Sequence, residues 1–370
     1  MALRRMTSAV MAAAMALAVV ALLVKPVPSR AGMVGPAYQV LPPIRQGNLT
    51  IFPVVANTQH NSGDFLTLDQ GLASGEVLVT EAGRLGLVRR HGNGTYYPIP
   101  RGDQVNQLVL VNNSKRALLL LAGEVVTGGK QDRIVGKDLI IPAESESDLA
   151  VFCVEPGRWT QTSANFHSTG GYGGGVYMAQ PSIRRQAMDK KSQQGVWDQV
   201  NAAKTALPAA APTGSRVAAE LAGVSSYARV MENKEIQQQV DAIAMPVEHS
   251  YDRLMRELRA RNAVGVVAAI NGRLVWADIF SSSALLEKYW PKLVRSYAAE
   301  ALESGGPRGN AGVAAAQDFL AALSGEHETT DTTPGVFRYS EITGEGFKVF
   351  ELTSLLPQAY YDVHISKMAD

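Results

Sequence analysis

The amino-acid sequence predicts an α+β fold. Short runs of β-favouring residues, separated by turn-forming clusters, fill the first half of the 370-residue chain. The second half combines amphipathic helical spacing with a strong hairpin signal at Asn271-Gly272. We therefore expect an antiparallel β-rich half, built as a sandwich or an open barrel, followed by a mixed half in which helices pack on a hairpin-based sheet.

The first 31 residues are typical of a secretory signal peptide. Arg4 and Arg5 form a positive start, and an apolar stretch from Ala9 to Val24 leads to a small-residue cleavage site that ends at Ala31. This stretch is shorter than the roughly 20 residues that cross a bilayer, and an uncleaved N-terminal anchor is the alternative. The sequence thus predicts export to the periplasm or the extracellular space.

Charge and cysteine content exclude several classes of protein. The chain has 35 basic and 34 acidic side chains, and the leader holds four basic residues and no acidic one, which leaves 31 basic against 34 acidic. A near-neutral surface argues against a nucleic-acid partner, and no later segment is apolar enough to span a membrane. Cys153 is the single cysteine, so an internal disulfide is impossible.

Composition divides the chain into five ranges, and the length favours two domains. The ranges are 1–31 for the signal peptide, 32–47 for a flexible N-terminal segment, 48–167 for a β-rich domain, 168–215 for a glycine-rich loop with a crossover helix, and 216–370 for an α+β domain. The sequence does not indicate an oligomeric state.

The β-rich range contains seven predicted strands and one short helix. The strands are 49–55, 76–80, 85–89, 107–111, 117–121, 138–141 and 148–154. The helix is indicated by the capping box Thr67-x-x-Gln70 and by a stop at Gly75.

The remainder mixes predicted helices and strands. The helices are 183–206, 249–261, 283–303 and 313–323, and the strands are 264–270, 273–280, 337–342, 347–352 and 360–365. A break over 207–215 follows the first helix. Pro291 is expected to kink the third helix or to mark its true start.

The stretch from Gly123 to Arg133 carries the densest group of candidate functional residues. The candidates are Glu124, Lys130, Gln131, Asp132 and Arg133. Adjacent glycines allow a tight turn whose exposed amide groups, together with Lys130 and Arg133, suit a small anion. The alternative is a glycine-hinged hairpin whose charged side chains pair with one another on a convex rim.

A second group of candidates follows Cys153. We expect Glu155, Arg158 and Trp159 to share a polar site with the first group. Cys153 lies in an apolar strand, which predicts a buried packing role. A nucleophilic role requires a distant histidine, and His167 is the nearest in the sequence.

Two further clusters have weaker claims. Asp278, near a strand end, is expected to accept a hydrogen bond from Arg295 or Tyr297, which is a structural pair at least as often as an active site. His327 and Asp331 occur in a stretch predicted as a polar loop. No paired histidine spacing, CxxC, GxSxG or GxGxxG motif is present, so no metal or cofactor is predicted.

Several short motifs resemble those of a known bacterial family. The motifs are Gly123-Glu124, Gly129-Lys130-Gln131-Asp132-Arg133, Cys153-Val154-Glu155-x-Gly157-Arg158-Trp159, Asp278-x-Phe280, Tyr289-Trp290-Pro291-Lys292-Leu293 and Ser296-Tyr297. Together they resemble the ARG and Rhodanese-Phosphatase-superfamily-associated Protein domain, where ARG denotes ADP-ribosylglycohydrolase. The likeness runs from about Asn48 to Ile365.

This resemblance has two implications. It implies that both halves form one unit, and the family's name, which records association with ADP-ribose-cleaving and phosphatase-like proteins, points to phosphorylated or nucleotide-derived ligands. One position departs from the family pattern, which has asparagine where this chain has Asp132. A carboxylate there repels an anion held by Lys130 and Arg133.

Three functions are compatible with these observations. The leading hypothesis is an exported binding or interaction protein whose partner is a small anionic ligand or another envelope protein. The alternative is a hydrolase that acts on a phosphate- or ADP-ribose-containing substrate, with Glu124 or Glu155 as general base. The third is a structural envelope protein. Convergence of the candidate side chains in a concave pocket distinguishes a site from a structural rim.

Overall fold

The fold is described from a computed structural model of the chain. The described residues are 37–81, 107–158, 160, 162–163, 165–167, 177–258, 263–306 and 309–370. The predicted signal peptide, the predicted strand 85–89, the glycine-rich loop 168–175 and Trp159 lie outside them. Contacts group Ala37–Asp370 as one compact unit.

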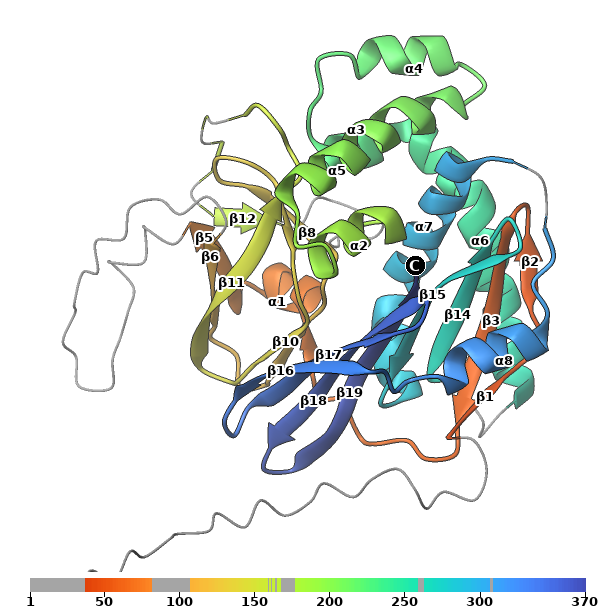
Figure 1. Ribbon diagram of the computed structural model, residues 1–370. Coiled ribbons are helices and arrows are strands. Elements are labelled where there is room, and N and C mark those ends of the chain that lie inside the picture. Colours follow the sequence, from red (N-terminus) through yellow and green to blue (C-terminus); the bar gives the residue numbers. More distant parts are fainter. Residues whose placement is uncertain are drawn as a thin grey trace, which may run out of the picture. The chain divides into compact units, whose positions relative to one another are not determined.

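Nine of the described strands form one antiparallel sheet (Figure 1). Its members are β1 (Tyr38–Val40), β2 (Ile44–Gln46), β3 (Leu49–Ala56), β14 (Gly265–Ile270), β15 (Arg273–Phe280), β16 (His327–Thr333), β17 (Phe337–Gly344), β18 (Phe347–Leu356) and β19 (Ala359–Ala369). The order is β1-β3-β14-β15-β19-β18-β17-β16, and β2 also pairs with β3. Strands from the two ends of the described chain therefore meet in one sheet.

The predicted hairpin is confirmed in this sheet. β14 and β15 are joined by Asn271, with a φ of 53°, and Gly272, with a φ of 77°. Two successive left-handed residues are what a type I′ turn requires, and asparagine followed by glycine adopts them at the least cost.

Six other strands close into a barrel. They are β5 (Val77–Glu81), β6 (Gln107–Asn112), β8 (Glu124–Gly128), β9 (Arg133–Val135), β11 (Ser145–Cys153) and β12 (Asn165–His167). β12 pairs with both β5 and β8, which completes the circle. The predicted α+β class is confirmed. The β-rich half was predicted as a sandwich or an open barrel, and in the structure its barrel is closed. β13 (Tyr177–Met178) also pairs with β8.

A small three-stranded sheet is formed by strands that alternate in the sequence with the barrel strands. It contains β4 (Leu66–Thr67), β7 (Leu118–Leu120) and β10 (Leu139–Ile141), and β4 runs parallel to β7. α1 (Leu68–Ser74) follows β4 and has the predicted capping box: the Thr67 hydroxyl accepts from the Gln70 amide, and the Gln70 side chain accepts from the Thr67 amide, both at 3.3 Å. Gly75 ends this helix with a φ of 72°.

Helices cover both faces of the large sheet (Figure 1). The remaining helices are α2 (Pro181–Met188), α3 (Gln193–Ala209), α4 (Gly214–Glu220), α5 (Tyr227–Glu232), α6 (Lys234–Leu258), α7 (Ser283–Ser304) and α8 (Val313–Ala321). α6 and α7 pack on the face that carries Ile51 and Val266, in a core that continues into the barrel. α8 packs on the opposite face, over Phe52 and Val267. No described helix is long and apolar enough to cross a membrane.

Three predicted elements are wrong in extent or type. The helix predicted over 183–206 is two helices, α2 and α3, and the second continues through Pro208 into the predicted break. The helix predicted over 249–261 is part of α6, which begins at Lys234. By contrast, α7 begins at Ser283 as predicted and is capped by Ser282, so Pro291 does not mark its start. The stretch from His327 is an edge strand, β16, rather than a loop; all of its side chains are exposed, so it shows no apolar alternation.

A buried ionic network joins helices, sheet and barrel. The Arg184 guanidinium on α2 binds both oxygens of Asp278 on β15, at 3.0 Å each, and stacks 4.3 Å from the Trp276 ring. On β19, the His364 Nε2 lies 3.2 Å from Asp278 and its Nδ1 lies 2.6 Å from Asp138. The other oxygen of Asp138 accepts a hydrogen bond from the Ala122 amide, just before β8. All four charged residues are fully buried.

Asp278 also meets one of its two predicted partners. The Tyr297 hydroxyl donates to it, as predicted, whereas Arg295 instead pairs with Asp241 at 3.1 Å and Glu248 at 2.9 Å. Although burial disfavours its charge, the Arg184 guanidinium holds the pKa of Asp278 well below its usual range. The cluster is thus an internal ion-pair network rather than a site open to a ligand.

We predict that this network makes folding stability fall at alkaline pH. Burial lowers the pKa of His364, but the Asp138 and Asp278 carboxylates outweigh it and raise the pKa from 6.5 to about 9. The native state therefore keeps a proton that the unfolded chain releases, so this stabilisation is complete below 6.5 and is lost as pH rises through about 9. Urea unfolding between pH 6 and pH 10 measures the slope.

The control for this prediction is His364→Gln, which removes the titrating group. Lys367, whose pKa burial lowers to about 8, opposes the slope in an overlapping range, so the quantity to compare is the difference between wild type and variant. Parallel stability curves for the two proteins across this range contradict the prediction.

Candidate functional site

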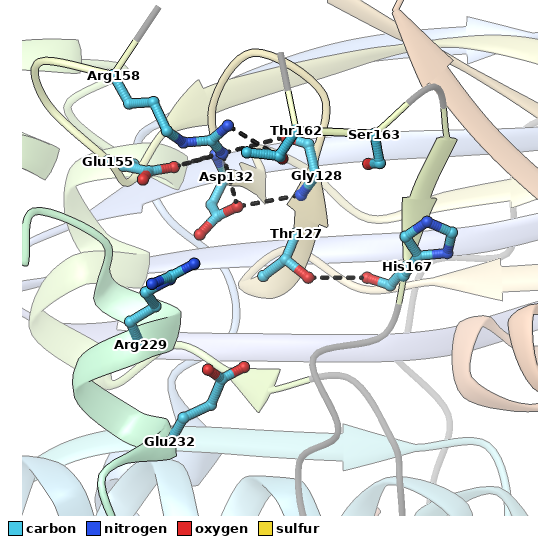
Figure 2. Close-up of a pocket in the computed structure, with 10 residues that line it drawn as sticks. All are labelled: Thr127, Gly128, Asp132, Glu155, Arg158, Thr162, Ser163, His167, Arg229 and Glu232. Atoms are coloured by element: carbon cyan, nitrogen blue, oxygen red, sulfur yellow. Dashed lines mark hydrogen bonds and ion pairs between the residues drawn. The ribbon is translucent and has the colours of Figure 1, made fainter. Parts of the chain in front are cut away.

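A polar cavity of about 260 Å³ opens where the barrel meets α5 (Figure 2). Its lining residues come from five parts of the chain: β8, the turn after β8, the segment between β11 and β12, β12 itself, and α5. They are Thr127, Gly128, Asp132, Glu155, Arg158, Thr162, Ser163, His167, Arg229 and Glu232. Three of the eight predicted site residues, Asp132, Glu155 and Arg158, are among them.

The turn between β8 and β9 forms one wall of the cavity. Gly128 and Gly129 have φ values of 128° and 53°, which favour glycine. A side chain at Gly129 would meet a second obstacle, since a Cβ added there would clash with the Phe166 ring. The sequence therefore needs both glycines to turn the chain tightly against β12 and to bring Asp132 to the cavity.

Arg158 ties this turn to the segment after β11. Its Nη2 donates to Glu155 Oε2 at 2.6 Å and to Asp132 Oδ1 at 3.3 Å. Its Nη1 donates to the Gly129 carbonyl at 3.1 Å and to the Thr162 hydroxyl at 3.1 Å. The guanidinium is therefore already engaged with carboxylates and carbonyls of the protein.

Asp132 is held from three sides. Besides Arg158, the Gly128 amide donates to Oδ1 at 3.1 Å, and the Ser226 hydroxyl donates to Oδ2 at 2.5 Å. Burial raises the pKa of Asp132, and the nearby Glu155 carboxylate raises it further, while the Ser226 hydrogen bond opposes both. The carboxylate is thus fixed in orientation but disfavoured in its charged form.

Ser226 also positions α5. It is the N-cap residue of that helix, and its hydroxyl accepts from the Arg229 amide at 3.2 Å. One serine therefore joins the cavity wall to the helix that carries Arg229 and Glu232. Figure 2 shows both of these side chains leaving α5 toward the cavity.

Arg229 and Glu232 are the site residues that sequence reasoning missed. In the described part of the chain, neither side chain makes a hydrogen bond or a salt bridge. Burial raises the pKa of Glu232, which the Arg229 charge partly offsets. Their only signal in the sequence is a spacing of three on a short helix, which ordinary surface residues share.

The other predicted residues lie away from the cavity. Glu124 is fully buried and forms an ion pair with Lys292, which also binds Asp69. Gln131 is buried and donates to the Glu155 carbonyl at 3.1 Å. The candidate residues therefore neither converge together in one concave pocket nor pair off on an exposed rim. Glu124, for example, is buried and joins α7 to the barrel through Lys292.

Three predicted residues remain to be placed. Arg133 is buried and donates to the Asp132 carbonyl at 3.3 Å, and burial lowers its pKa. The Lys130 amide donates to Glu81 at 3.0 Å, and its side chain is half-buried without lining the cavity. Trp159 lies outside the described residues.

The buried packing role predicted for Cys153 is confirmed. Its side chain is 1% exposed, and burial raises the pKa of the thiol. The thiol contacts the Glu155 backbone and does not line the cavity, whereas His167 does. Among the described residues, no three His, Cys, Asp or Glu side chains gather as a metal site requires.

Fold and site together define an α+β protein in which a closed six-stranded barrel carries a charged cavity beside a large antiparallel sheet. The chain belongs to the family of the ARG and Rhodanese-Phosphatase-superfamily-associated Protein domain, whose pattern matches residues 37–366. The resemblance noted in the sequence is thereby confirmed over nearly the whole chain. No curated protein and no solved structure matches it.

We predict that Arg158→Lys destabilises the protein although the charge is kept. A lysine ammonium cannot reach the set of acceptors that the planar guanidinium binds, so we expect a loss of about 1–3 kcal/mol in the free energy of unfolding. Arg229→Lys is the matched control, with an expected change within about 0.5 kcal/mol. Urea denaturation measures both, and equal effects of the two substitutions contradict this role of Arg158.

Proposed function

We propose that this protein is an exported binding protein that holds a small polar ligand in the cavity beside α5. The observation that carries the proposal is the pair of opposite charges on one helix. Arg229 and Glu232 are both directed into the cavity, without a hydrogen bond or salt bridge from the described residues (Figure 2). A ligand with matching groups supplies the partners that these side chains lack.

The cavity's remaining polar groups support binding by being fixed in advance. Asp132, Glu155 and Arg158 are locked to one another and to the backbone before any ligand arrives. A rigid wall loses little conformational entropy on binding, so more of the contact energy appears as affinity. The arrangement is that of a preformed site.

The hydrolase alternative has less support. Of its two candidate bases, Glu124 is engaged with Lys292 outside the cavity. Glu155 faces the cavity, but its Oε2 already accepts hydrogen bonds from both Arg158 and the Asp132 amide, so that oxygen is not free to take a proton from a bound water. Binding therefore ranks above catalysis.

Export is the second part of the proposal and rests on the predicted leader. We expect cleavage after Ala31, because that residue ends the small-residue site behind the apolar stretch. N-terminal sequencing of the protein recovered from a bacterial host should begin at Gly32. A recovered chain that still begins at Met1 and sediments with the membrane fraction contradicts cleavage and favours the anchored alternative.

A thermal-shift screen tests ligand binding at this cavity. We expect at least one compound to raise the melting temperature in a panel of amino acids, sugars, sugar phosphates, nucleotides, ADP-ribose and divalent metals. Arg229→Trp, which fills the cavity from an exposed helix position, should abolish that rise.

The control is Lys234→Trp, which places the same side chain on the next helix and outside the cavity. It should leave the rise intact. Either a panel without any response, or a response that Arg229→Trp does not change, refutes binding at this cavity.

A further inference from the structure

The charges of the cavity specify the class of ligand. Resting on the proposed function, we infer that the ligand is a small zwitterion that carries an ammonium and a carboxylate group on the same carbon atom, as in a free α-amino acid. The carboxylate pairs with Arg229 and the ammonium with Glu232.

One cation and one carboxylate of the lining make no hydrogen bond or salt bridge with the described residues. Two arginines and three carboxylates line the cavity: Arg158, Arg229, Asp132, Glu155 and Glu232. Arg158 is bound to both Asp132 and Glu155, so those three groups largely satisfy one another. Arg229 and Glu232 remain, one of each sign, for the ligand.

The spacing of these two groups matches a ligand with adjacent charges. Residues three apart on a helix are neighbours, with about 5–6 Å between their Cβ atoms. Arg229 and Glu232 have this spacing on α5. A guanidinium binds a carboxylate through two parallel hydrogen bonds, and a carboxylate accepts from an ammonium, so one compact zwitterion engages both.

Ligands with a single kind of charge fit less well. A phosphate dianion at Arg229 faces the carboxylates of Glu232, Asp132 and Glu155, and like charges at that range repel. A simple amine leaves the Arg229 guanidinium without a hydrogen-bonded carboxylate, and a neutral sugar offers neither side chain a hydrogen-bonding group of opposite charge. Only a ligand with both signs compensates both side chains.

The size of the cavity limits the ligand further. Its volume of about 260 Å³ is below the roughly 300–1,000 Å³ of pockets that hold drug-sized molecules. An amino acid fits within this space, whereas a molecule as long as ADP-ribose places part of itself outside the cavity. Size and charge therefore agree.

Isothermal titration calorimetry of the full-length protein tests the inference with matched probes. The twenty common L-amino acids are screened, and for each that binds, the amine without the carboxylate and the acid without the amino group are titrated. Inorganic phosphate and glucose complete the set. We expect at least one amino acid to bind, and each half-molecule to bind roughly ten- to a hundredfold more weakly.

Two charge-neutralising variants assign the contacts. Arg229→Gln should weaken the amino acid and the acid but not the amine, and Glu232→Gln should weaken the amino acid and the amine but not the acid. Both positions are exposed, so both variants should keep the wild-type urea midpoint. Lys234→Gln, outside the cavity, should change none of these affinities.

The outcomes separate the ligand class from the site itself. If phosphate or glucose binds, no amino acid does, and Arg229→Trp blocks that binding, the zwitterion is wrong and the cavity stands. If half-molecules bind as tightly as the amino acid, the pairing with both charges is wrong. If nothing binds in this set or in the wider panel, both proposals fall.

Discussion

A buried pair of charges, Arg184 and Asp278, underlies the architecture of this protein. Both side chains are fully buried, so neither can lose its partner without leaving an uncompensated charge in the interior. His364 extends the pair to Asp138, next to the barrel strands. Because the four residues come from separate elements, they specify one arrangement of helix, sheet and barrel in which all four charges are satisfied.

A second buried ion pair, Lys292 with Glu124, works in the same way between α7 and β8. Together these buried ion pairs fix the start of β8, because Glu124 is its first residue. The position of β8 in turn determines the position of the turn that follows it, which contains Asp132. From Asp132 the Ser226 hydroxyl reaches the start of α5. Contacts that begin in the core therefore determine the position of the cavity. They also position α5, which carries Arg229 and Glu232.

Local signals in the sequence were sufficient for many elements of the fold. The hairpin at Asn271 and the capping box at Thr67 depend on residues close in sequence, and both are confirmed. Barrel closure depends on β12, a strand of three residues without a pattern of its own, and no local signal predicts it. β16 also escaped prediction, since an exposed edge strand of threonines and acids lacks apolar alternation.

The candidate site followed the same division between local and long-range information. The sequence brought Asp132, Glu155 and Arg158 to notice through glycine-rich motifs that surround them. Their association with Arg229 and Glu232 requires the path from the barrel to α5, which spans about a hundred residues and which no spacing rule encodes. Glu124 was predicted to belong to the site but does not line the cavity. Its ion pair with Lys292 joins residues far apart in the sequence, so no local pattern predicts it.

The cavity lies on the seam where the barrel closes. β12 joins β8 through only two residue pairs, Phe166 with Gly128 and His167 with Thr127, and three of these four residues line the cavity. Short strands that are held by few backbone hydrogen bonds are among the parts of a barrel that open most easily. The proposed ligand would contact both the β8–β12 junction and α5, and would thereby stabilise the closed barrel. The buried ion pairs lie outside the cavity lining, so occupation of the cavity would leave them intact.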